Sequence, residues 1–154
     1  MGTQALAVGL TGTRKGMTSE QIDRIRLLFL ELMPAEFRHG MDDGADSDGH
    51  VILRSIPELA SCRIVGHPPI NKAHSTKHYT GADACDELMP ELNYLARDHE
   101  LVKAVDILLA TPDGYVNIPR GSGTWATIRA AHKLNVTTFI VFPDGSVERR
   151  DPAC

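Results

Sequence analysis

Short apolar runs alternate with segments of helical periodicity along the whole chain, and this alternation limits the possible folds more than any other feature. The predicted strands cover residues 5–10, 36–39, 61–66, 105–111 and 137–142. The predicted helices cover residues 18–33, 45–56, 92–102 and 122–134. Such alternation is typical of a Rossmann-like, doubly wound α/β fold, in which helices cover both faces of a parallel sheet.

Local signals support several of these boundaries. Thr18 precedes the first helix with Gln21 three residues on, which is a capping-box pattern, and Pro34 ends that helix. Near the end of the chain Asp144-Gly145 predicts a turn, and residues 147–150 predict a short edge strand.

The order of the strands follows from connection rules. We expect a single domain over residues 1–154, with about five strands in the order 3-2-1-4-5, because crossovers are right-handed and the order reverses at a switch point. Strands 1 and 4 are then neighbours. The loops that follow them, residues 12–16 and 120–124, face each other across the crevice where such sheets bind ligands.

The loop at residues 120–124 has the composition of a phosphate site. Gly121 and Gly123 permit a tight turn and close approach, and the helix that begins there leaves its first amides for an anion. The side chains in the two loops that can donate to phosphate are Thr13, Arg14, Arg120, Ser122 and Thr124. The alternative is a plain helix start capped by Ser122 or Thr124. The facing loop with Gly12 favours phosphate binding.

Composition excludes several classes of function. The chain has 154 residues and a net charge of −4, which argues against a nucleic-acid surface. It contains no apolar run near the ~18 residues that span a membrane and no signal-peptide pattern, so we expect a cytoplasmic protein. Cys62, Cys85 and Cys154 lack paired spacing and are expected to be reduced thiols.

Residues 67–90 are the least regular segment, and a loop of that length is functional or mobile. His74 and His78 lie four residues apart and on a helix could share a metal ion, but the segment has neither a helical period nor a third ligand. We expect no metal and no cofactor. A lid that touches phosphate is the favoured interpretation, with these side chains in it: His67, Lys72, His74, Lys77, His78 and Tyr79.

Three motifs together resemble one superfamily. Gly12-Thr13-Arg14 follows the first strand, His39-Gly40 precedes Gly44-Ala45-Asp46 and His50, and Arg97 precedes the strand and loop that end in Gly121-Ser122-Gly123-Thr124. They resemble the SLOG group of nucleotide-binding domains, which includes the Lonely Guy phosphoribohydrolases and DNA-processing protein A. Small phage and bacterial relatives are similar at residues 12–18 and 122–127.

The resemblance implies a ligand site made by residues from all three motifs. They are Gly12, Thr13, Arg14, Gly44, Asp46, Arg97, Arg120, Gly121, Ser122, Gly123 and Thr124. It also implies a homo-oligomer, a dimer or larger.

The chain departs from the phosphoribohydrolases at one position that matters. Those enzymes place a catalytic Glu just after Gly-Thr, whereas this chain has Trp125-Ala126-Thr127 there and a longer spacing after Pro112. If the chain is a hydrolase, the candidate catalytic residues are Arg97, Asp46, Asp98 and Glu100. The alternatives are that Asp46 is a helix cap, that Asp98 and Glu100 are solvated, and that Trp125 anchors the core rather than stacking on a base.

The leading hypothesis is a protein that senses or sequesters a phosphate-bearing nucleotide or nucleotide-derived signal between two glycine loops. The alternative is a nucleoside 5′-monophosphate N-glycosidase that releases a free base. DNA binding, by analogy with DNA-processing protein A, is disfavoured by the acidic balance.

Overall fold

The computed structural model describes residues 5–75 and 78–152. Its strands are β1 Ala7–Gly12, β2 Glu36–His39, β3 Arg63–Gly66, β4 Glu87–Leu88, β5 Ile107–Thr111, β6 Thr137–Val141 and β7 Val147–Arg150. Its helices are α1 Ser19–Leu32, α2 Ala45–Arg54, α3 Tyr94–Lys103 and α4 Gly123–Lys133, with a 3-10 turn at Pro57–Leu59.

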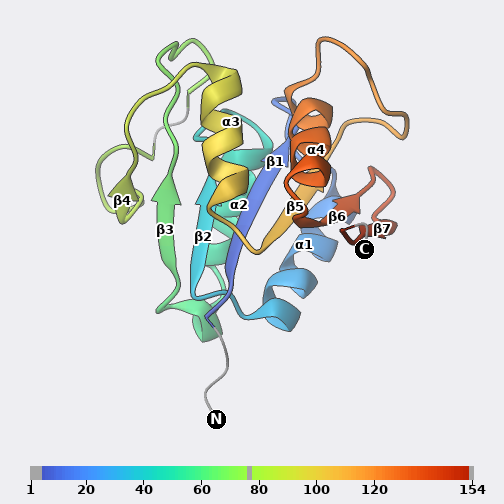
Figure 1. Cartoon of the computed structure of the whole chain (residues 1–154). Helices are drawn as coiled ribbons and strands as arrows, with labels where there is room; N and C mark the ends of the chain where they lie inside the picture. The colour runs from blue at the N-terminus through green and yellow to red at the C-terminus, as the bar shows by residue number, and fades with distance from the viewer. Residues whose placement is uncertain (1–4, 76–77, 153–154) are drawn as a thin grey trace.

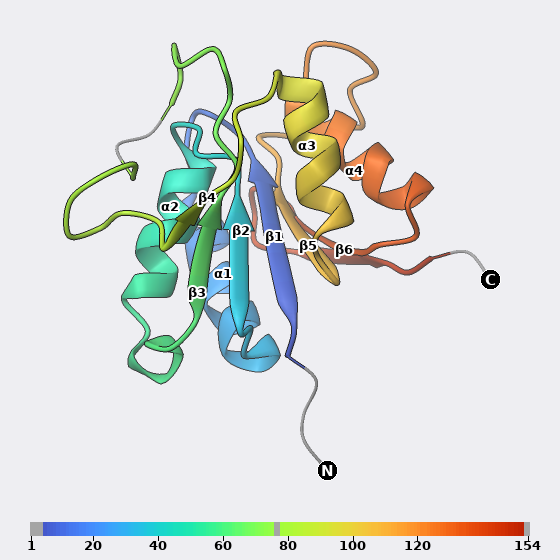
Figure 2. The same ribbon diagram turned by 60° about the vertical axis from the view of Figure 1, so that its left-hand side comes forward.

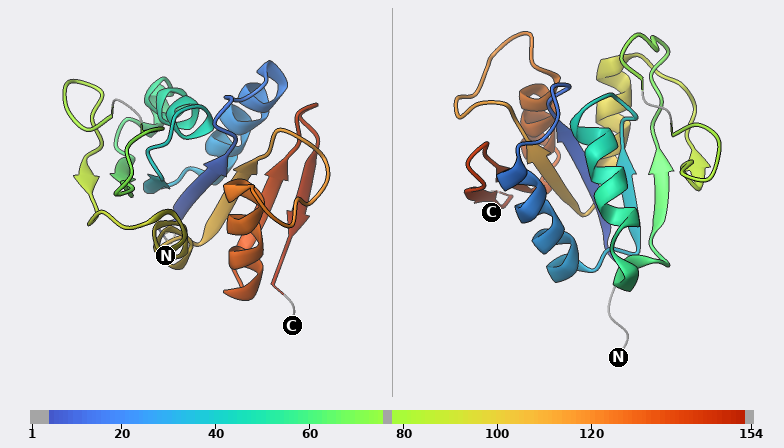
Figure 3. Two further views of the ribbon diagram at one scale, coloured as in Figure 1. Left: turned by 90° about the horizontal axis from the view of Figure 1, so that it is seen from above. Right: turned by 180° about the vertical axis from the view of Figure 1, so that it is seen from behind.

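The strands form one seven-stranded sheet in the order β4-β3-β2-β1-β5-β6-β7, parallel except for β7. Helices α3 and α4 lie in front of the sheet in Figure 1, and Figure 3 shows α1 and α2 on the opposite face. Figure 2 shows the strands fanning from β4 towards β6. The fold is therefore the expected doubly wound α/β architecture.

The predicted order of the five strands is confirmed, and one further strand lies at each edge of the sheet. The five predicted strands lie as β3-β2-β1-β5-β6, which is 3-2-1-4-5 in their own numbering. Strand β4 is added inside the segment predicted to be irregular, where Val65 and Gly66 pair with Glu87 and Leu88. Strand β7 is the antiparallel edge strand expected at residues 147–150.

Three predicted strands begin two residues later than expected, β1 at Ala7, β3 at Arg63 and β5 at Ile107. Strand β1 also continues to Gly12, because Thr11 and Gly12 still pair with Ala110 and Thr111 of β5. Gly12 is thus the last strand residue and also the first residue of the segment predicted as a loop. Strand β5 begins two residues later than predicted, since the Asp106 carboxylate accepts a hydrogen bond from the Ala7 amide instead of continuing the strand.

The core fills the space on both faces of the sheet. The largest apolar cluster lies under α1 and α2 and includes Phe29, Phe37 and Leu53, each nearly inaccessible to solvent. The capping box predicted at Thr18 and Gln21 is present. Within the described part of the chain, no helix combines the length and the apolar character needed to cross a bilayer.

Candidate functional site

A cavity of about 460 Å³ opens at the carboxyl ends of β1 and β5, where the strand order reverses. Its walls come from a first loop (residues 12–16), a turn after β2 (residues 40–46), the start of α3, and a segment that ends in a second loop (residues 120–124). Figure 3 shows this edge of the sheet from above. Open α/β sheets bind ligands at this position.

The first loop is closed by protein contacts. The Thr13 amide donates to the Thr111 carbonyl at 3.0 Å, and the Thr13 carbonyl accepts from the Ala45 amide at 2.9 Å. Gly44, which precedes α2, has a φ of +83°, and a Cβ there would lie 2.4 Å from the backbone of Arg14. The start of α2 therefore holds this loop in place.

Two basic side chains of the first loop reach the cavity. The Arg14 guanidinium lies 5.0 Å from the centre of the Tyr94 ring, and Lys15 forms an ion pair of 3.1 Å with Asp113. All four residues line the cavity. They bring positive charge to its mouth, while Asp113 offsets part of it.

The second loop is open. Gly121 has a φ of +82°, and a Cβ added at Gly121 or Gly123 would meet no described atom within 4 Å. The Ser122 hydroxyl accepts from the Trp125 amide at 3.2 Å and caps α4, which is the alternative that the sequence offered to phosphate binding. The amides of Gly123 and Thr124 have no carbonyl four residues earlier in the helix, and both residues line the cavity, so these two amides are the candidate anion donors.

The inner wall is built around Arg97, which is 3% exposed. Its Nε donates to Asp98 Oδ1 at 2.6 Å, its Nη2 donates to Asp42 Oδ2 at 3.0 Å, and its Nη1 donates to the Gly40 carbonyl. Burial acts to lower the pKa of Arg97, but the carboxylates of Asp98 and Asp42 outweigh it and raise that pKa. Arg97 thus neutralises protein carboxylates, and it also lines the cavity, so its predicted contact with phosphate stays a prediction.

Asp46 lies at the bottom of the same wall. Its Oδ2 accepts from the backbone amides of Gly40 and Asp42 at 3.1 and 3.2 Å. Burial and the neighbouring Asp42 carboxylate raise the pKa of Asp46 to about 8. Burial also raises the pKa of Asp98 above its ordinary range. Asp46 is therefore mostly protonated near neutral pH.

Most of the predicted site residues line this cavity. Those that do are Gly12, Thr13, Arg14, Asp46, Arg97, Asp98, Gly121, Ser122, Gly123 and Thr124. Gly44 lies behind the first loop, Arg120 is exposed outside the lining, and Glu100 faces another pocket and pairs with Lys103 at 3.5 Å. Glu100 lies on a different face of α3 from Arg97, Asp98 and Leu101, which line the cavity.

The structure adds residues to the wall that sequence reasoning did not single out. Asp42 is the most informative, because its Oδ1 is buried without a hydrogen-bond partner among the described residues. Tyr94, Asp113 and Thr127 also line the cavity. The only sequence signal for Asp42 was its position just after a predicted strand in a Gly- and Asp-rich turn.

Trp125 has the core-anchor role that was given as its alternative. It is 2% exposed and packs in a core cluster with Ile128 and Ile140, so it anchors α4.

The described part of the segment at residues 67–90 lies away from the cavity, since none of its described residues lines it. His74 is exposed, His78 is buried, and Lys77 lies outside the described residues. Contact of this segment with a phosphate stays a prediction.

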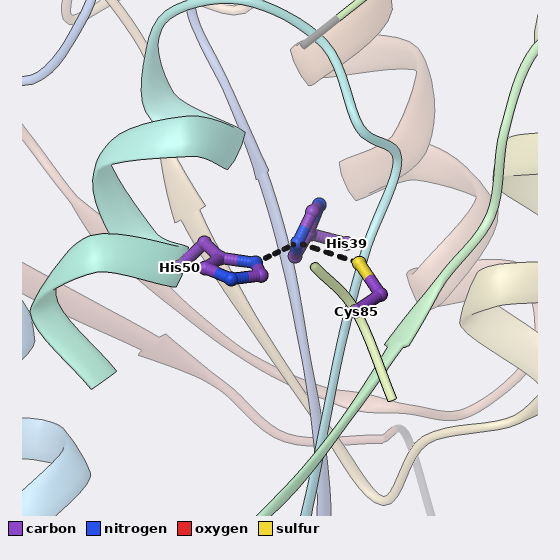
Figure 4. Close-up of side chains that lie close together, drawn as sticks. All are labelled: His39, His50 and Cys85. Carbon is purple, nitrogen blue, oxygen red and sulfur yellow. Dashed lines mark hydrogen bonds between the residues drawn. The ribbon is translucent and has the colours of Figure 1, made fainter. Parts of the chain in front are cut away.

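Three histidines instead form a buried cluster behind the 40–46 turn. His39 Nε2 lies 2.9 Å from His50 Nδ1, and the His50 ring stacks on the His78 ring with centroids 3.8 Å apart. Figure 4 shows His39 between His50 and Cys85, whose Sγ lies 3.8 Å from His39 Nε2. Asp83 Oδ1 lies 3.1 Å from His50 Nε2.

This cluster contains two groups with metal-ligand chemistry, His39-His50-Cys85 and His50-His78-Asp83, each with its ligand atoms within 4.8 Å of one another. A metal-bound histidine keeps its proton on the other ring nitrogen. The Met41 amide, however, donates to His39 Nδ1 at 3.0 Å, so the His39 proton lies on Nε2, where the first group needs a lone pair. Hydrogen bonding therefore explains the His39-His50-Cys85 group better than metal binding.

Comparisons with known proteins identify the fold. No protein-family profile matches the chain, and no curated protein matches its sequence. Among solved structures, the molybdenum cofactor binding protein of the phototrophic bacterium Rippkaea orientalis is similar, with a TM-score of 0.65, 14% identity, and coverage of 92% of this chain and 78% of that one. The structural-genomics target TM1055 is similar with a TM-score of 0.59, 20% identity, and coverage of 86% and 72%. These similarities show a Rossmann-like fold.

Proposed function

We propose that the chain binds a phosphate-bearing nucleotide or nucleotide-derived small molecule in the cavity between the two loops. The observation that carries the proposal is the set of polar groups that line the cavity. The α4 N-terminus, Arg14 and Lys15 line it together with the carboxyl groups of Asp42, Asp46 and Asp98. A phosphate suits the first set, and the hydroxyl or amino groups of a nucleoside suit the second.

Two further facts support this assignment. The solved structure from Rippkaea orientalis is described as a molybdenum cofactor binding protein, which is a Rossmann-like protein with a small-molecule ligand. Asp42 Oδ1 is buried and lacks a partner among the described residues, so a ligand hydroxyl would satisfy it. Membership in the SLOG group is part of the same proposal.

Calorimetric titration tests the proposal with nucleoside monophosphates, ADP-ribose and cyclic nucleotides. We expect binding that Arg14→Ala weakens about tenfold, because a charge-assisted contact to phosphate is lost. Arg120→Ala is the matched control, since Arg120 is exposed outside the lining and its loss is expected to leave affinity unchanged. Absence of binding by every phosphorylated nucleoside contradicts the proposal.

A second function, hydrolysis of the N-glycosidic bond of a nucleoside monophosphate, is favoured by one observation. Asp46 and Asp98 line the cavity together, and the raised pKa of Asp46, about 8, keeps a proton available for a departing base. Water would attack the ribose carbon, giving free base and ribose 5-phosphate. Chromatography of incubated nucleoside monophosphates separates the two functions, because a binding protein releases no base.

We also propose that the chain forms a homo-oligomer. Leu95 and Ile70 are 76% and 62% exposed, and Leu95 lines a second, apolar pocket beside α3. Association would remove this apolar surface from water. Light scattering at two concentrations tests it, and a monomeric mass at both contradicts it.

A further inference from the structure

The histidine cluster and the cavity share the 40–46 turn. His39 ends β2 immediately before this turn, and His39 Nδ1 accepts a hydrogen bond from the Met41 amide at 3.0 Å. Met41 has a φ of +61°, which places a non-glycine residue in the left-handed region. Such a conformation is strained and persists where the surroundings hold it.

The same turn positions the carboxyl groups of the cavity. The amides on either side of Met41, from Gly40 and Asp42, both donate to Asp46 Oδ2. The Gly40 carbonyl and the Asp42 carboxylate both accept from Arg97. A change at Met41 would therefore move Asp42 and Asp46 together.

The hydrogen bonds assign the donor at each step from His39 through His50 to Asp83. A backbone amide is always a donor, so His39 Nδ1 must be unprotonated and the proton of neutral His39 lies on Nε2. That proton is donated to His50 Nδ1 over 2.9 Å, which places the His50 proton on Nε2. His50 Nε2 in turn donates to the Asp83 carboxylate over 3.1 Å.

Asp83 is the outer end of this chain. Its side chain is 50% exposed, whereas His39 and His50 are fully buried. It also meets the second stacked histidine, because His78 Nδ1 lies 3.3 Å from Asp83 Oδ2 and His78 Nε2 lies 3.0 Å from the Ser47 hydroxyl. A surface carboxylate in the irregular segment is thus connected to a turn in the cavity wall.

We propose that Asp83, acting through His50, fixes the His39 tautomer that holds the 40–46 turn, so that all three are positioning residues for ligand binding in the cavity. The proposal rests on the proposed nucleotide-binding function for its effect on affinity. Its tautomer assignment stands on the hydrogen bonds alone. None of the three residues lines the cavity, so none touches the ligand.

The arrangement also predicts an acid-sensitive affinity. A proton added to His39 would turn Nδ1 into a donor that faces the Met41 amide, and the turn would lose its anchor. Charged and titratable groups from four elements surround His39. They are His50 of α2, His67 after β3, His78 and Cys85 of the irregular segment, and Arg97 of α3. Burial and the neighbouring histidines lower the pKa of His39, so the loss comes in acid.

Nitrogen-15 spectroscopy of the imidazole rings tests the assignment without any ligand. We expect His39 and His50 of the full chain to carry their protons on Nε2 at neutral pH. In Asp83→Ala, His50 Nε2 loses its acceptor, so a population with the other tautomer is expected, together with about tenfold faster hydrogen exchange of the Met41 amide. A proton on Nδ1 of His39 in the unmodified chain overturns the proposal.

Affinity for AMP, as the calorimetric probe, tests the link to the cavity. Asp83→Ala is expected to weaken AMP binding about tenfold, as is typical when the partner of an orienting histidine is lost. The matched control is Glu91→Ala, a carboxylate of similar exposure in the same region that pairs with Lys72. Equal affinities of Asp83→Ala and the unmodified chain, alongside measurable AMP binding, overturn the proposal.

Substitutions at His39 separate positioning from simple packing. His39→Asn keeps a side-chain oxygen near the place of Nδ1 for the Met41 amide but has no proton to gain, so we expect it to retain AMP binding and lose the protein's share of the acid sensitivity. The AMP phosphate itself titrates, and this contribution to the pH profile is the same for His39→Asn and for the unmodified chain. His39→Leu is expected to lose binding. Identical pH profiles for His39→Asn and the unmodified chain contradict the proposal, whereas a chain with the assigned tautomers that binds no nucleotide contradicts only the proposed function.

Discussion

The two glycine loops at the cavity differ in what their glycines touch. In the first loop and the start of α2 behind it, a Cβ on Gly12 or Gly44 would lie within 2.5 Å of other protein atoms. In the second loop, a Cβ on Gly121 or Gly123 would meet no described atom within 4 Å. The first pair allows the backbone to pack, whereas the second leaves space beside a helix N-terminus. We infer that the first loop is framework and the second is ligand surface.

The largest expected effect is a difference in stability between Gly44→Ala and Gly121→Ala. The two glycines have nearly the same φ, +83° and +82°, but only a Cβ at Gly44 would collide with backbone. Left-handed strain alone costs about 1 kcal/mol at Gly121, and the added collision is expected to bring the loss at Gly44 to about 3 kcal/mol or more. Urea unfolding of the two variants measures the difference directly.

Gly121→Ala is itself the control in that experiment, since it also has a positive φ but lacks the contact. Equal losses of unfolding free energy in the two variants would show that the first loop has room to move. The division into framework and ligand surface would then be wrong.

The buried histidines lie behind the 40–46 turn, and the free energy of unfolding of the protein is expected to depend on pH because of them. Burial, followed by nearby positive groups, lowers the pKa of His50 and His67 to about 4 and that of His39 well below 6.5. Unfolded histidines bind protons below about pH 6.5. The free energy of unfolding is therefore greatest above that pH with respect to these histidines, and it falls on acidification towards about pH 4.

The titration of Asp46 changes the free energy of unfolding in the opposite direction. Its folded pKa, raised to about 8 by burial and Asp42, means that folded Asp46 holds a proton which the unfolded chain releases above pH 3.8. The stabilisation of the folded state by protonated Asp46 is lost as the pH rises to about 8. We therefore expect greatest stability near pH 6.5, with the decline above that pH abolished in Asp46→Asn. Denaturant unfolding at several pH values measures this, and a flat profile below pH 6.5 would contradict the buried neutral histidines.

Sequence reasoning found the framework because its signals are local or follow from connection rules. The Thr18 capping box and the strand order depend on neighbouring residues or on right-handed crossovers. The Ser122 cap, given as the alternative to phosphate binding, also depends on neighbouring residues. The two loops were also placed correctly on either side of the cavity. These features needed no side-chain contact between distant elements.

The inner wall and the histidine cluster could not be predicted in the same way. Arg97 joins Asp42 and Asp98, and a sequence does not show that a guanidinium is already neutralised by a carboxylate 55 positions away. His78 was paired with His74 by spacing, yet it stacks on His50 of α2 because the irregular segment folds back over that helix. Contacts of this kind depend on packing between elements rather than on periodicity.

A smaller effect is expected for Gly123→Ala in the second loop. Gly123 begins α4, so the substitution is expected to change the free energy of unfolding by less than about 1 kcal/mol, in the stabilising direction, because alanine favours helix. The new methyl group would occupy the space beside the helix N-terminus and weaken AMP binding about tenfold. Calorimetry and urea unfolding of one protein sample measure both quantities. Unchanged affinity would remove the second loop from the ligand surface.

The smallest expected effect concerns the ion pair that joins the first loop to the segment that leads into the second loop. Lys15 of the first loop meets Asp113 of the opposite segment at 3.1 Å, with side chains 81% and 41% exposed. An exposed pair stabilises a protein by about 0–1 kcal/mol, so Asp113→Asn is expected to leave unfolding almost unchanged. It removes a negative charge that competes with phosphate for Lys15, and AMP affinity is expected to rise about threefold at low salt.

The matching substitution, Lys15→Gln, is expected to lower AMP affinity at low salt by a similar factor, and added salt should reduce both effects because exposed charges are screened. This pair of variants tests whether the first loop contributes charge as well as framework. If Asp113→Asn weakens AMP binding instead, Asp113 contacts the ligand itself, and the carboxyl groups of the cavity are then not confined to its inner wall.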